Sequence, residues 1–348
     1  MKIVIQNIQI KSIASYLPKH NLELKELSVL YGDKEVERII NATGIERVRI
    51  ADVGETSSDM CFNAVEHLLR EEKIKKDDIS GLVFVSQTAD YILPSTAIIL
   101  QDRLGLNTET ICLDIHYGCS GYIYGIFQAA LWIQSGMCEN VLVLAGDTSS
   151  RMINAHDKSL RMVFGDCGTA TLISKGDFPI GVSLKSDGSG YDKLIVPAGG
   201  FRKPISSDTS VLQFDQDGNG RTENDLFMDG SEIFNFAISN VHRDINELIE
   251  FMNWNKTDVK QYFLHQANTF MLDYVRKKLK VEKEYIPMNV KNYGNTGPAT
   301  IPLLLTDFLY DNKIVLDKTI FSGFGVGLSW GSIACNLEQT RFYEPLNK

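Results

Sequence analysis

The sequence predicts a layered α/β fold. Continuous apolar runs at 82–85 and 141–145 are typical of strands buried on both faces. Segments 57–72 and 122–136 lie between such runs and carry apolar residues at helical spacing. Strands that alternate with helices in this way favour sheets covered by helices.

Chain length bounds the domain organisation. The chain has 348 residues, of which 44% are hydrophobic and 23% charged, as in globular proteins. This length suits two domains of ordinary size or one large duplicated fold. No repeat is visible at the level of residue identity. We predict a division near Gly176, with an N-terminal half at 1–175 and a C-terminal half at 176–348.

The N-terminal half is expected to begin with one strand at 3–13. A mostly helical segment follows at 22–40 and is expected to break near Gly32, and Ser57 or Ser58 is expected to cap the next helix. Further strands and helices alternate up to the division. The expected helices lie at 22–40, 57–72, 96–104 and 122–136, and the later strands at 82–86, 110–115, 141–146 and 169–173.

The C-terminal half repeats this pattern loosely. A helix that begins near Gly230 and a short buried strand that ends at His265 are its clearest elements. The expected strands lie at 181–185, 193–196, 262–264, 318–321 and 331–337, and the expected helices at 230–251, after 265 to about 280, and 299–310.

Composition excludes several classes of function. The net charge of −9 argues against a nucleic-acid partner. No apolar run has the length of a membrane span, and the N-terminus lacks the apolar core of a signal peptide. We therefore expect a cytoplasmic protein with no membrane partner.

No metal site is expected. The six cysteines form no CxxC pair, so neither a disulfide framework nor a zinc ribbon is indicated. Residues 215–220 begin like a calcium loop, but the twelfth position is Leu226, where a bidentate glutamate is needed. We expect a surface turn there.

Cys119 is the candidate nucleophile. It lies where a predicted strand meets a predicted helix, and a helix start favours negative charge, which would lower the pKa of the thiol. The alternative is a small core residue. His265 and Asn295, far downstream, favour catalysis, although alone each fits an ordinary position at a strand end or in a turn.

Three separated motifs carry a family resemblance. They are Cys119-Ser-Gly, His265-Gln-Ala-Asn268 and Gly294-Asn295-Thr-Gly-Pro-Ala. Ala42-Thr-Gly-Ile45, Phe164-Gly-Asp166 and the Gly-rich segment 324–331 add to them. In this order and spacing they resemble the thiolase-fold β-ketoacyl-acyl-carrier-protein synthase III family, over nearly the whole chain.

The resemblance implies a five-layered αβαβα fold built from two similar halves, and usually a homodimer. It implies that Cys119 accepts an acyl group, while His265 and Asn295 act on malonyl thioester. The backbone N–H groups of Cys119 and Val326 would form an oxyanion hole. It implies no cofactor beyond the substrates, which are acyl-CoA or acyl-carrier protein and malonyl-carrier protein.

The resemblance also marks positions that contact the substrate or the acyl carrier protein: Leu93, Lys158, Gln266, Phe270, Arg276 and Lys277. Leu93 matches a position that reaches into the partner's acyl pocket, and is otherwise a loop leucine. The basic run at 276–278 matches the carrier-docking face, and is otherwise a solvated helix face.

Several positions depart from the family pattern. Arg38 and Ala42 stand where an aromatic residue and an arginine hold CoA, and Phe270 replaces a third arginine. These departures favour a donor acyl group carried by a protein. His116 and Tyr117 are bulkier than the residues common before the nucleophile, which predicts a primer other than acetyl.

The chemistry gives each residue a role. A thioester on Cys119 holds the acyl group on a good leaving atom, and decarboxylation of malonyl thioester supplies the carbanion. The developing enolate oxygen needs donors, which neutral His265 and the Asn295 amide can supply. Two alternatives remain: transfer of the acyl group to an oxygen or nitrogen nucleophile without condensation, and a non-catalytic partner in a heterodimer.

Overall fold

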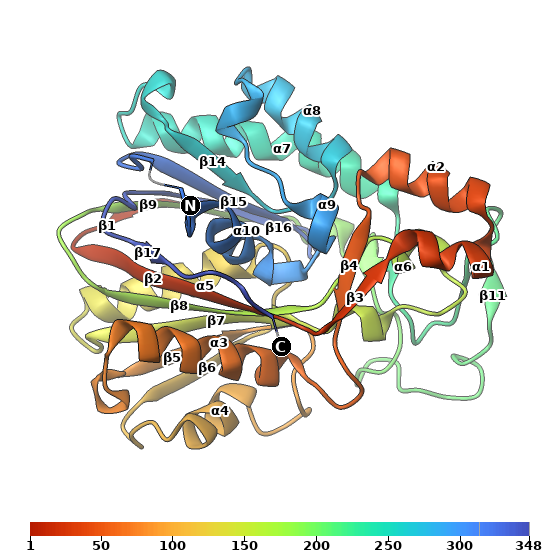
Figure 1. The fold of residues 1–348 in the computed structure, drawn as a ribbon, viewed down its shortest axis with the longest axis horizontal. Coiled ribbons are helices and arrows are strands. Elements are labelled where there is room, and N and C mark those ends of the chain that lie inside the picture. The colour runs from red at the N-terminus through yellow and green to blue at the C-terminus, as the bar shows by residue number, and fades with distance from the viewer. Residues whose placement is uncertain (313, 348) are drawn as a thin grey trace.

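The structure is a computed structural model that describes residues 1–312 and 314–347. Two sheets lie one above the other, with helices between them and on both outer faces (Figure 1). The 7-stranded sheet contains, in order, β17 (Arg341–Phe342), β2 (Ile8–Leu17), β8 (Cys167–Lys175), β7 (Asn140–Asp147), β5 (Gly81–Val85) and β6 (Ile111–Ile115), with β18 (Leu346–Asn347) also paired to β2. The 5-stranded sheet contains β1 (Lys2–Ile5), β9 (Ile180–Ser186), β16 (Ser329–Cys335), β15 (Thr319–Gly325) and β14 (Gln261–Leu264).

The helices complete five layers. α3 (Ser57–Glu72) and α4 (Thr96–Leu104) cover the outer face of the 7-stranded sheet. α7 (Gly230–Phe251) and α8 (Thr269–Leu279) cover the 5-stranded sheet. α5 (Gly121–Gln134) and α10 (Thr300–Leu309) lie between the sheets. The five-layered αβαβα fold is confirmed.

α5 suits the central layer because it is apolar nearly all round. Ile123, Ile126, Ala129 and Ala130 are fully buried and belong to the core that joins the two sheets. A helix with no polar face gains most when both sides are covered.

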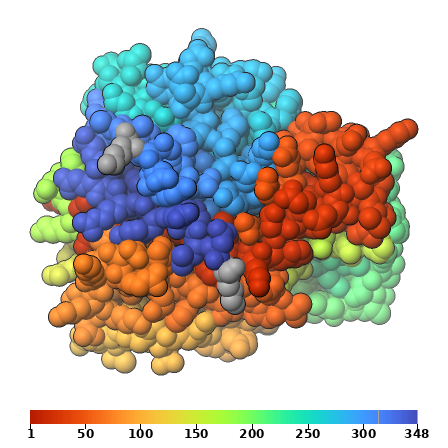
Figure 2. Space-filling model, viewed as in Figure 1, coloured from red at the N-terminus to blue at the C-terminus, as the bar shows by residue number. Residues whose placement is uncertain are grey.

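Chain ends cross between the two sheets. β1 pairs with β9 in the sheet built mainly from the C-terminal half. β17 and β18 pair with β2 in the other sheet, and in Figure 2 the dark-blue C-terminal segment lies between the orange and light-blue surfaces. The predicted division at 175/176 falls between β8 and β9, and stays a prediction.

Smaller elements complete the described chain. They are β3 (His20–Glu23), β4 (Arg47–Ile50), β10 (Leu194–Ile195), β11 (Gln213–Phe214), β12 (Gly220–Arg221), β13 (Phe227–Met228), α1 (Ser28–Tyr31), α2 (Asp33–Thr43), α6 (Lys158–Arg161) and α9 (Val290–Tyr293). Short 3₁₀ turns lie at Leu24–Leu27, Lys76–Asp78, Ser149–Met152, Gly188–Gly190, Lys256–Asp258, Lys283–Tyr285 and Gly297–Ala299.

Two element predictions near the N-terminus were wrong. The strand expected at 3–13 is two strands in different sheets, separated at Asn7, whose φ is +61°. The mostly helical segment expected at 22–40 begins as strand β3, while the break expected near Gly32 is confirmed, with φ of +83° at that residue. A non-glycine residue with positive φ, such as Asn7, also stops regular structure, and periodicity alone does not locate it.

The start of α3 also differs from the prediction. Thr56, not Ser57 or Ser58, is the N-cap, and it forms a capping box with Asp59. Both serine hydroxyls bond elsewhere, that of Ser57 to Thr88 O at 2.8 Å and that of Ser58 to Asp90 Oδ2 at 2.7 Å.

The turn at 215–220 joins β11 to β12, as expected of a surface turn. One carboxylate oxygen of Asp215 accepts hydrogen bonds from the backbone N–H groups of Asp217 and Asn219. Arg221 pairs with the other oxygen at 3.0 Å. The Asp215 carboxylate therefore stabilises the turn to which it belongs.

Candidate active site

Cys119, His265 and Asn295 line one cavity of about 420 Å³, together with Phe324 and Gly325. Cys119 lies between β6 and α5, His265 directly follows β14, and Asn295 precedes α10. The cavity therefore lies where the two sheets and the central helices meet. Three side chains from distant parts of the chain share it, as the sequence motifs indicated.

Glycines of β15 let the chain approach the nucleophile. A Cβ atom on Gly325 would lie 2.8 Å from Cys119 Sγ, and one on Gly323 would lie 2.8 Å from the Cys119 carbonyl oxygen. Real Cβ atoms do not come so close to other heavy atoms. Any side chain at either position would separate β15 from the nucleophile, which explains glycine at both.

The expected low pKa of Cys119 was wrong. Burial raises the pKa of the thiol to about 12, and the carboxylate of Asp147 raises it further. The backbone N–H groups of Val326 and Cys119 point at the sulfur and lower the pKa by less. Cys119 precedes the N-cap Ser120 and is only 5% exposed, so desolvation outweighs any helix effect. The side chain of Cys119 is therefore a thiol at neutral pH.

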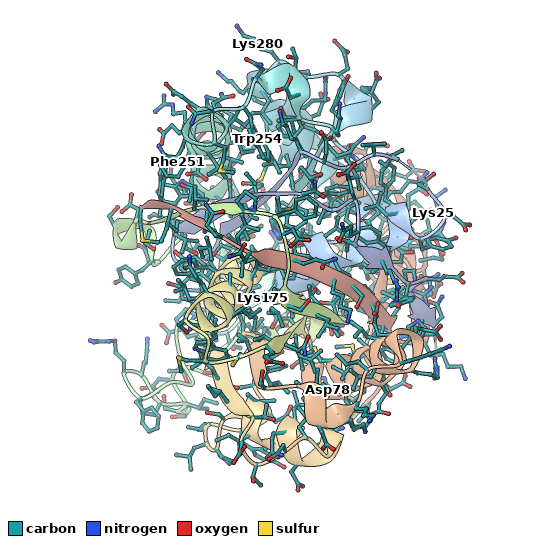
Figure 3. The ribbon with its side chains drawn as sticks, turned by 90° about the vertical axis from the view of Figure 1, so that its left-hand side faces the viewer. Lys25, Asp78, Lys175, Phe251, Trp254 and Lys280 are labelled. Carbon is teal, nitrogen blue, oxygen red and sulfur yellow. The ribbon has the colours of Figure 1, made fainter. Side chains whose placement is uncertain are left out.

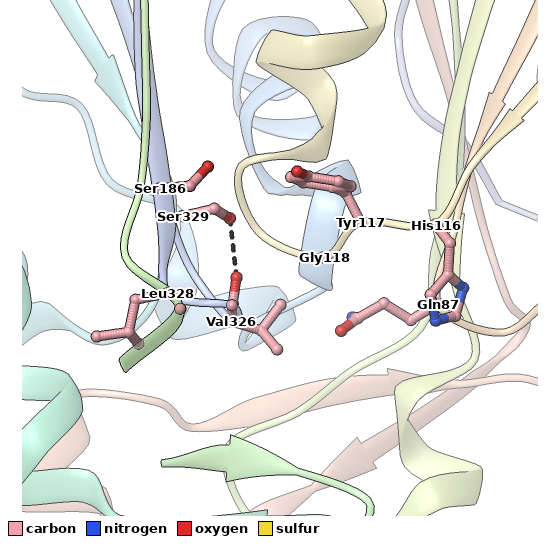
Figure 4. Close-up of a pocket in the computed structure, with 10 residues that line it drawn as sticks. Gln87, His116, Tyr117, Gly118, Ser186, Val326, Leu328 and Ser329 are labelled. Atoms are coloured by element: carbon pink, nitrogen blue, oxygen red, sulfur yellow. Dashed lines mark hydrogen bonds between the residues drawn. The ribbon is translucent and has the colours of Figure 1, made fainter. Parts of the chain in front are cut away.

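The segment that follows Gly325 is held by two serines. The Ser329 hydroxyl donates to the Val326 carbonyl oxygen at 2.8 Å (Figure 4). The Ser120 hydroxyl lies 2.6 Å from Ser329 Oγ, which links this segment to the start of α5. The N–H groups of Val326 and Cys119 thus converge at the sulfur, where the oxygen of a bound thioester would develop charge.

His265 is a neutral imidazole. Burial lowers its pKa to about 3, and the residue is only 2% exposed. Nδ1 lies 2.7 Å from Thr300 Oγ1. The ring meets Phe324 edge to face, with 5.4 Å between centroids and 89° between planes. The imidazole is therefore fixed, uncharged and able to donate or accept one hydrogen bond in the cavity.

Asn295 is held by its backbone and by its own turn. Its N–H donates to the Val163 carbonyl at 2.8 Å, and its carbonyl accepts from Gly165 N–H at 3.0 Å. The side-chain oxygen accepts from Gly297 N–H at 3.0 Å. Because this oxygen is occupied, the NH₂ end is the one available to a ligand in the cavity.

Asp147 is a site residue that the sequence analysis missed. It is fully buried, and burial raises its pKa to about 6. Its carboxylate accepts from the backbone N–H and the side-chain Nε2 of Gln87, each at 2.7 Å, and from Ser86 Oγ at 2.9 Å. An acid at the end of the apolar run 141–146 was the signal that could have marked it. Thr300 and Phe324 were also missed as contacts of His265, and only the fold reveals them.

A second cavity, of about 310 Å³, borders the loop before the nucleophile (Figure 4). His116 and Tyr117, the pair that is bulky in sequence, line it with Gln87 and Leu328. Tyr117 also packs on Tyr124, with 4.4 Å between ring centroids. His116 and Tyr117 therefore form part of the wall of this second cavity, beside the candidate active site.

An aromatic cluster borders the main cavity. Phe270 lines the cavity and is 57% exposed. It stacks on Phe234 at 5.3 Å between centroids, and Tyr274 lies 5.9 Å away. The position where the family pattern has an arginine is therefore apolar in three dimensions as well.

The basic residues near the cavity are paired. Arg38, which lines the cavity, makes a two-point contact with Glu35 at 2.8 and 2.9 Å. Lys158 Nζ lies 3.3 Å from the same carboxylate and donates to the Asp217 carbonyl at 2.7 Å. The hydrogen bond from Arg38, followed by that from Lys158, lowers the pKa of Glu35 to about 2.

Two of the predicted contact residues, Gln266 and Arg276, hydrogen-bond to groups of the protein itself. Gln266 is buried; its Nε2 donates to the Leu264 carbonyl, and its Oε1 accepts from Asn289 N–H. Arg276 donates to Asp273 at 2.8 Å and to the Val281 carbonyl at 3.0 Å. These bonds use both polar ends of the Gln266 amide and the Nε and Nη1 groups of Arg276, and the contact roles predicted for the two residues stay predictions.

The two remaining contact residues are exposed. Lys277 lies on the outer face of α8 and pairs with Asp273 at 2.9 Å. Leu93 is 78% exposed and lies beside the exposed Tyr91 and Ile92. Their predicted roles concern partner molecules and stay predictions.

Comparisons with known proteins agree on one family. Family models described as 3-oxoacyl-[acyl-carrier-protein] synthase III match residues 113–188, and its C-terminal part matches 249–337. The β-ketoacyl-[acyl-carrier-protein] synthase III of Caldanaerobacter subterraneus is 33% identical over 322 residues, which cover 91% of this chain and 94% of that protein. The enzyme of the same name from Clostridium perfringens is 32% identical over 96% of this chain and 100% of its own. This chain belongs to the β-ketoacyl-[acyl-carrier-protein] synthase III family.

Solved structures of the family share the fold. A 3-oxoacyl-(acyl-carrier protein) synthase from Burkholderia xenovorans superposes with a TM-score of 0.94 at 35% identity, over 100% of this chain and 99% of its own. The synthase III from Thermus thermophilus gives 0.78 at 28% identity, over 93% and 97%.

Metal-binding and membrane-spanning features were searched in the described part of the chain. Residues 1–312 and 314–347 hold no cluster of three or more His, Cys, Asp or Glu side chains suited to a metal ion. Among the same residues, no helix has the length and apolar character needed to cross a membrane.

The raised pKa of Cys119 predicts how the thiol reacts. Only the thiolate is alkylated, so the rate with iodoacetamide should rise about tenfold per pH unit from pH 7 to 10 without a plateau, given a pKa near 12. Peptide mass spectrometry separates Cys119 from the other cysteines, and Cys119→Ser provides the blank. A plateau reached near pH 7 would show a thiolate paired with His265 and contradict this account.

Proposed function

We propose that this chain catalyses the decarboxylative condensation of an acyl group bound to Cys119 with malonyl-acyl-carrier protein. The observation that carries the proposal is the shared cavity of Cys119, His265 and Asn295. Membership of the synthase III family supports it, since the named relatives are β-ketoacyl-acyl-carrier-protein synthases.

The first half-reaction loads the enzyme. Cys119 sulfur attacks the carbonyl carbon of an acyl thioester, the S–C bond to the donor breaks, and the thiol proton passes to the departing sulfur. The N–H groups of Cys119 and Val326 stabilise the oxygen that becomes negative in between. Because the thiol has a pKa near 12, it loses its proton during the attack and not before.

The second half-reaction forms the carbon–carbon bond. Malonyl thioester loses CO₂, and the electron pair of the broken bond moves into an enolate. His265 and the Asn295 amide donate hydrogen bonds to the enolate oxygen. The enolate carbon attacks the acyl carbon, the bond to Cys119 breaks, and the released sulfur takes up a proton. No cofactor is needed, because decarboxylation supplies the carbanion.

Simple acyl transfer to an oxygen or nitrogen nucleophile would not need the second pair of donors. The cavity holds both His265 and Asn295, each fixed by hydrogen bonds, which favours condensation over transfer. The same cavity reaches Cys119, which a non-catalytic heterodimer partner would not require.

The variant Asn295→Ala should affect the two half-reactions differently. Acylation of Cys119, followed by intact-protein mass spectrometry, should proceed at close to the wild-type rate. Release of ¹⁴CO₂ from labelled malonyl-carrier protein should fall about 10²- to 10³-fold, the usual effect of losing one such donor. The variant Asn292→Ala, in the preceding helix α9, is the control. Normal CO₂ release in Asn295→Ala would remove this amide from the reaction.

We further propose that the priming acyl group arrives on an acidic carrier protein and not on CoA. Arg38, which lines the cavity, and Lys158 both pair with Glu35, whose single carboxylate offsets one of their two charges, and Phe270 is apolar. These residues therefore offer few unpaired cations that could bind the phosphate groups of CoA. Basic residues instead gather at the C-terminal end of α8, at Arg276, Lys277, Lys278 and Lys280.

Asp273 pairs with both Arg276 and Lys277, so it offsets only part of the positive charge at this end of α8. Burial, followed by the nearby Arg243 and Lys278, lowers the pKa of His242. Burial and the nearby Lys280 lower the pKa of Lys256. An excess of cations attracts an acidic partner and speeds its encounter.

Donor choice and docking are tested together. Wild-type enzyme should acylate Cys119 faster from an acyl-carrier protein than from the same acyl-CoA, and Lys277→Glu/Lys278→Glu should raise KM for the carrier-bound donor about tenfold while sparing acyl-CoA. Lys75→Glu is the control: the Lys75 backbone N–H donates to Asp78 at 3.3 Å, and Asp78 lies in the lower half of the molecule in Figure 3, far from Lys280 at the top. Equal effects of the double variant on both donors would contradict docking at this face.

We also propose a homodimer. β6 is the edge strand of the 7-stranded sheet, and its residues Ile111, Leu113 and Ile115 are only partly buried. An open apolar edge is completed when a second copy pairs with it. Ile92 and Leu93 add exposed apolar surface.

We also place the enzyme in the cytoplasm, where the Cys119 thiol stays reduced. Export of the full chain from its source cell would contradict this localisation.

A substitution on the edge strand β6 tests the proposed homodimer. Leu113→Lys on β6 should shift the enzyme from dimer to monomer in sedimentation velocity, because a buried unpaired lysine is costly at an interface. Ile98→Lys, at an exposed position of α4, is the matched control. A wild-type protein that sediments as a monomer at micromolar concentration would contradict the dimer.

A further inference from the structure

The second cavity, of about 310 Å³, lies next to the nucleophile loop. Gly118, which directly precedes Cys119, and Val326, whose N–H points at the sulfur, both line it. The main cavity is lined by Cys119 itself, together with His265 and Asn295. The loop that carries the nucleophile therefore borders two cavities.

The proposed condensation needs more than one space. Malonyl thioester has to reach His265 and Asn295 while the acyl group still occupies Cys119, so the acyl chain must leave that part of the main cavity free. The second cavity can take the chain, because it begins at the residue before the nucleophile. Its volume is at the low end of the range for ligand pockets, about 300–1,000 Å³, which suits a short acyl group.

Gln87 brings a fixed amide into the second cavity. Its Nε2 donates to Asp147 Oδ2 at 2.7 Å, and its backbone N–H donates to Oδ1 of the same carboxylate at 2.7 Å. A carboxylate accepts hydrogen bonds, so the NH₂ end of the amide must face Asp147, and the oxygen is the end left for the cavity. In Figure 4 the Gln87 side chain extends across the cavity towards Val326.

The oxygen of this amide lies beside the nucleophile loop. A Cβ atom on Gly118 would be 2.6 Å from Gln87 Oε1, closer than real Cβ atoms come, so glycine at 118 leaves this oxygen its place one residue from Cys119. Within residues 1–312 and 314–347, no protein group donates a hydrogen bond to Oε1, whereas the Nε2 end has its partner. A half-buried acceptor of this kind favours a ligand that supplies a donor.

The remaining walls of the second cavity indicate which donor fits. Val326, Leu328 and the ring of Tyr117 offer apolar surface for a carbon chain. Among the described residues that line the cavity, none is Lys, Arg, Asp or Glu, so an ammonium group or a carboxylate on the chain would have little to pair with. A neutral hydroxyl is the donor that suits this combination of an apolar wall and one amide oxygen.

We propose that the second cavity binds the chain of a short hydroxyacyl group carried by Cys119, and that Gln87 selects this group by accepting a hydrogen bond from its hydroxyl. The inference rests on the proposed function for the loading of Cys119. Because Gln87 Oε1 lies beside Gly118, the hydroxyl belongs near the thioester end of the chain, as in a 3-hydroxyacyl group.

Matched acyl donors test this choice. Wild-type enzyme should acylate Cys119 from one enantiomer of 3-hydroxybutyryl-carrier protein with a kcat/KM about fivefold higher than from butyryl-carrier protein, the order expected for one hydrogen bond. Acetoacetyl-carrier protein, which has an oxygen at the same carbon but no hydroxyl proton, should gain nothing over butyryl. Intact-protein mass spectrometry follows the loading. Equal kcat/KM values for the first two donors, or no loading from the hydroxyacyl donor, would overturn the proposal.

A variant connects the preference to the amide. Gln87→Met keeps the length of the side chain and removes the acceptor, so the ratio of the two kcat/KM values should fall to about one. Gln101→Met, in α4, removes another side-chain amide, whose Nε2 donates to the Leu106 carbonyl at 2.6 Å, and should keep the wild-type ratio. The ratio compares two donors on one protein, so a general loss of active enzyme does not change it. A wild-type ratio in Gln87→Met would contradict selection by this amide.

A crystal structure of the loaded enzyme shows the contact directly. In Asn295→Ala acylated with the 3-hydroxybutyryl group, the hydroxyl oxygen should lie about 2.5–3.0 Å from Gln87 Oε1. An acyl chain that lies in the main cavity instead would overturn the assignment of the second cavity.

The outcomes also separate this inference from the proposed function. If the hydroxyacyl group is loaded preferentially but no CO₂ is released from malonyl-carrier protein, the condensation fails while the role of Gln87 stands. If CO₂ is released and the butyryl and 3-hydroxybutyryl groups are loaded equally well, the condensation stands and the role of Gln87 is wrong.

Discussion

The close approach of β15 to the nucleophile loop is the constraint on which the site depends. Gly323 and Gly325 allow the strand to lie against Cys119 and Ser120 at distances that no Cβ atom permits. This approach aims Val326 N–H at the sulfur and places Phe324 against the His265 ring. It also joins the two sheets, because β15 belongs to one sheet and Cys119 follows a strand of the other. The contact between β15 and Cys119 therefore both packs the two sheets together and positions the groups of the site.

Burial at that contact sets the charge states of the site. Desolvation raises the pKa of the Cys119 thiol and lowers that of His265, so both groups are neutral at pH 7. A neutral thiol and a neutral imidazole do not form an ion pair at rest. The site is thus organised around directed hydrogen-bond donors and not around a pre-formed thiolate. Donors that are fixed before the reaction need no rearrangement when charge develops on a substrate oxygen.

Prediction from sequence succeeded where a pattern reflects local physics. The helices at 57–72, 96–104 and 230–251 have those bounds in the structure, because their apolar spacing reflects the face that packs on a sheet. Prediction failed at Asn7, where one residue with positive φ redirects the chain, and at Leu22 and Glu23, which belong to strand β3; the break expected near Gly32 is confirmed. The contact roles expected of Gln266 and Arg276 stay predictions, and both side chains also bond groups of the protein itself. The lowered pKa expected of Cys119 was wrong because the surrounding layers, not the adjacent helix, control its hydration.

The sequence by itself determined the alternation of strands and helices, the family motifs and the three chemical groups at Cys119, His265 and Asn295. These properties belong to residue types and their spacing, which remain visible without coordinates. Tertiary structure alone decided which groups are buried from water, which cations pair with Glu35, and that Thr300 contacts the imidazole. Such properties arise where segments far apart in the chain exclude water from one another, and no local pattern records that exclusion.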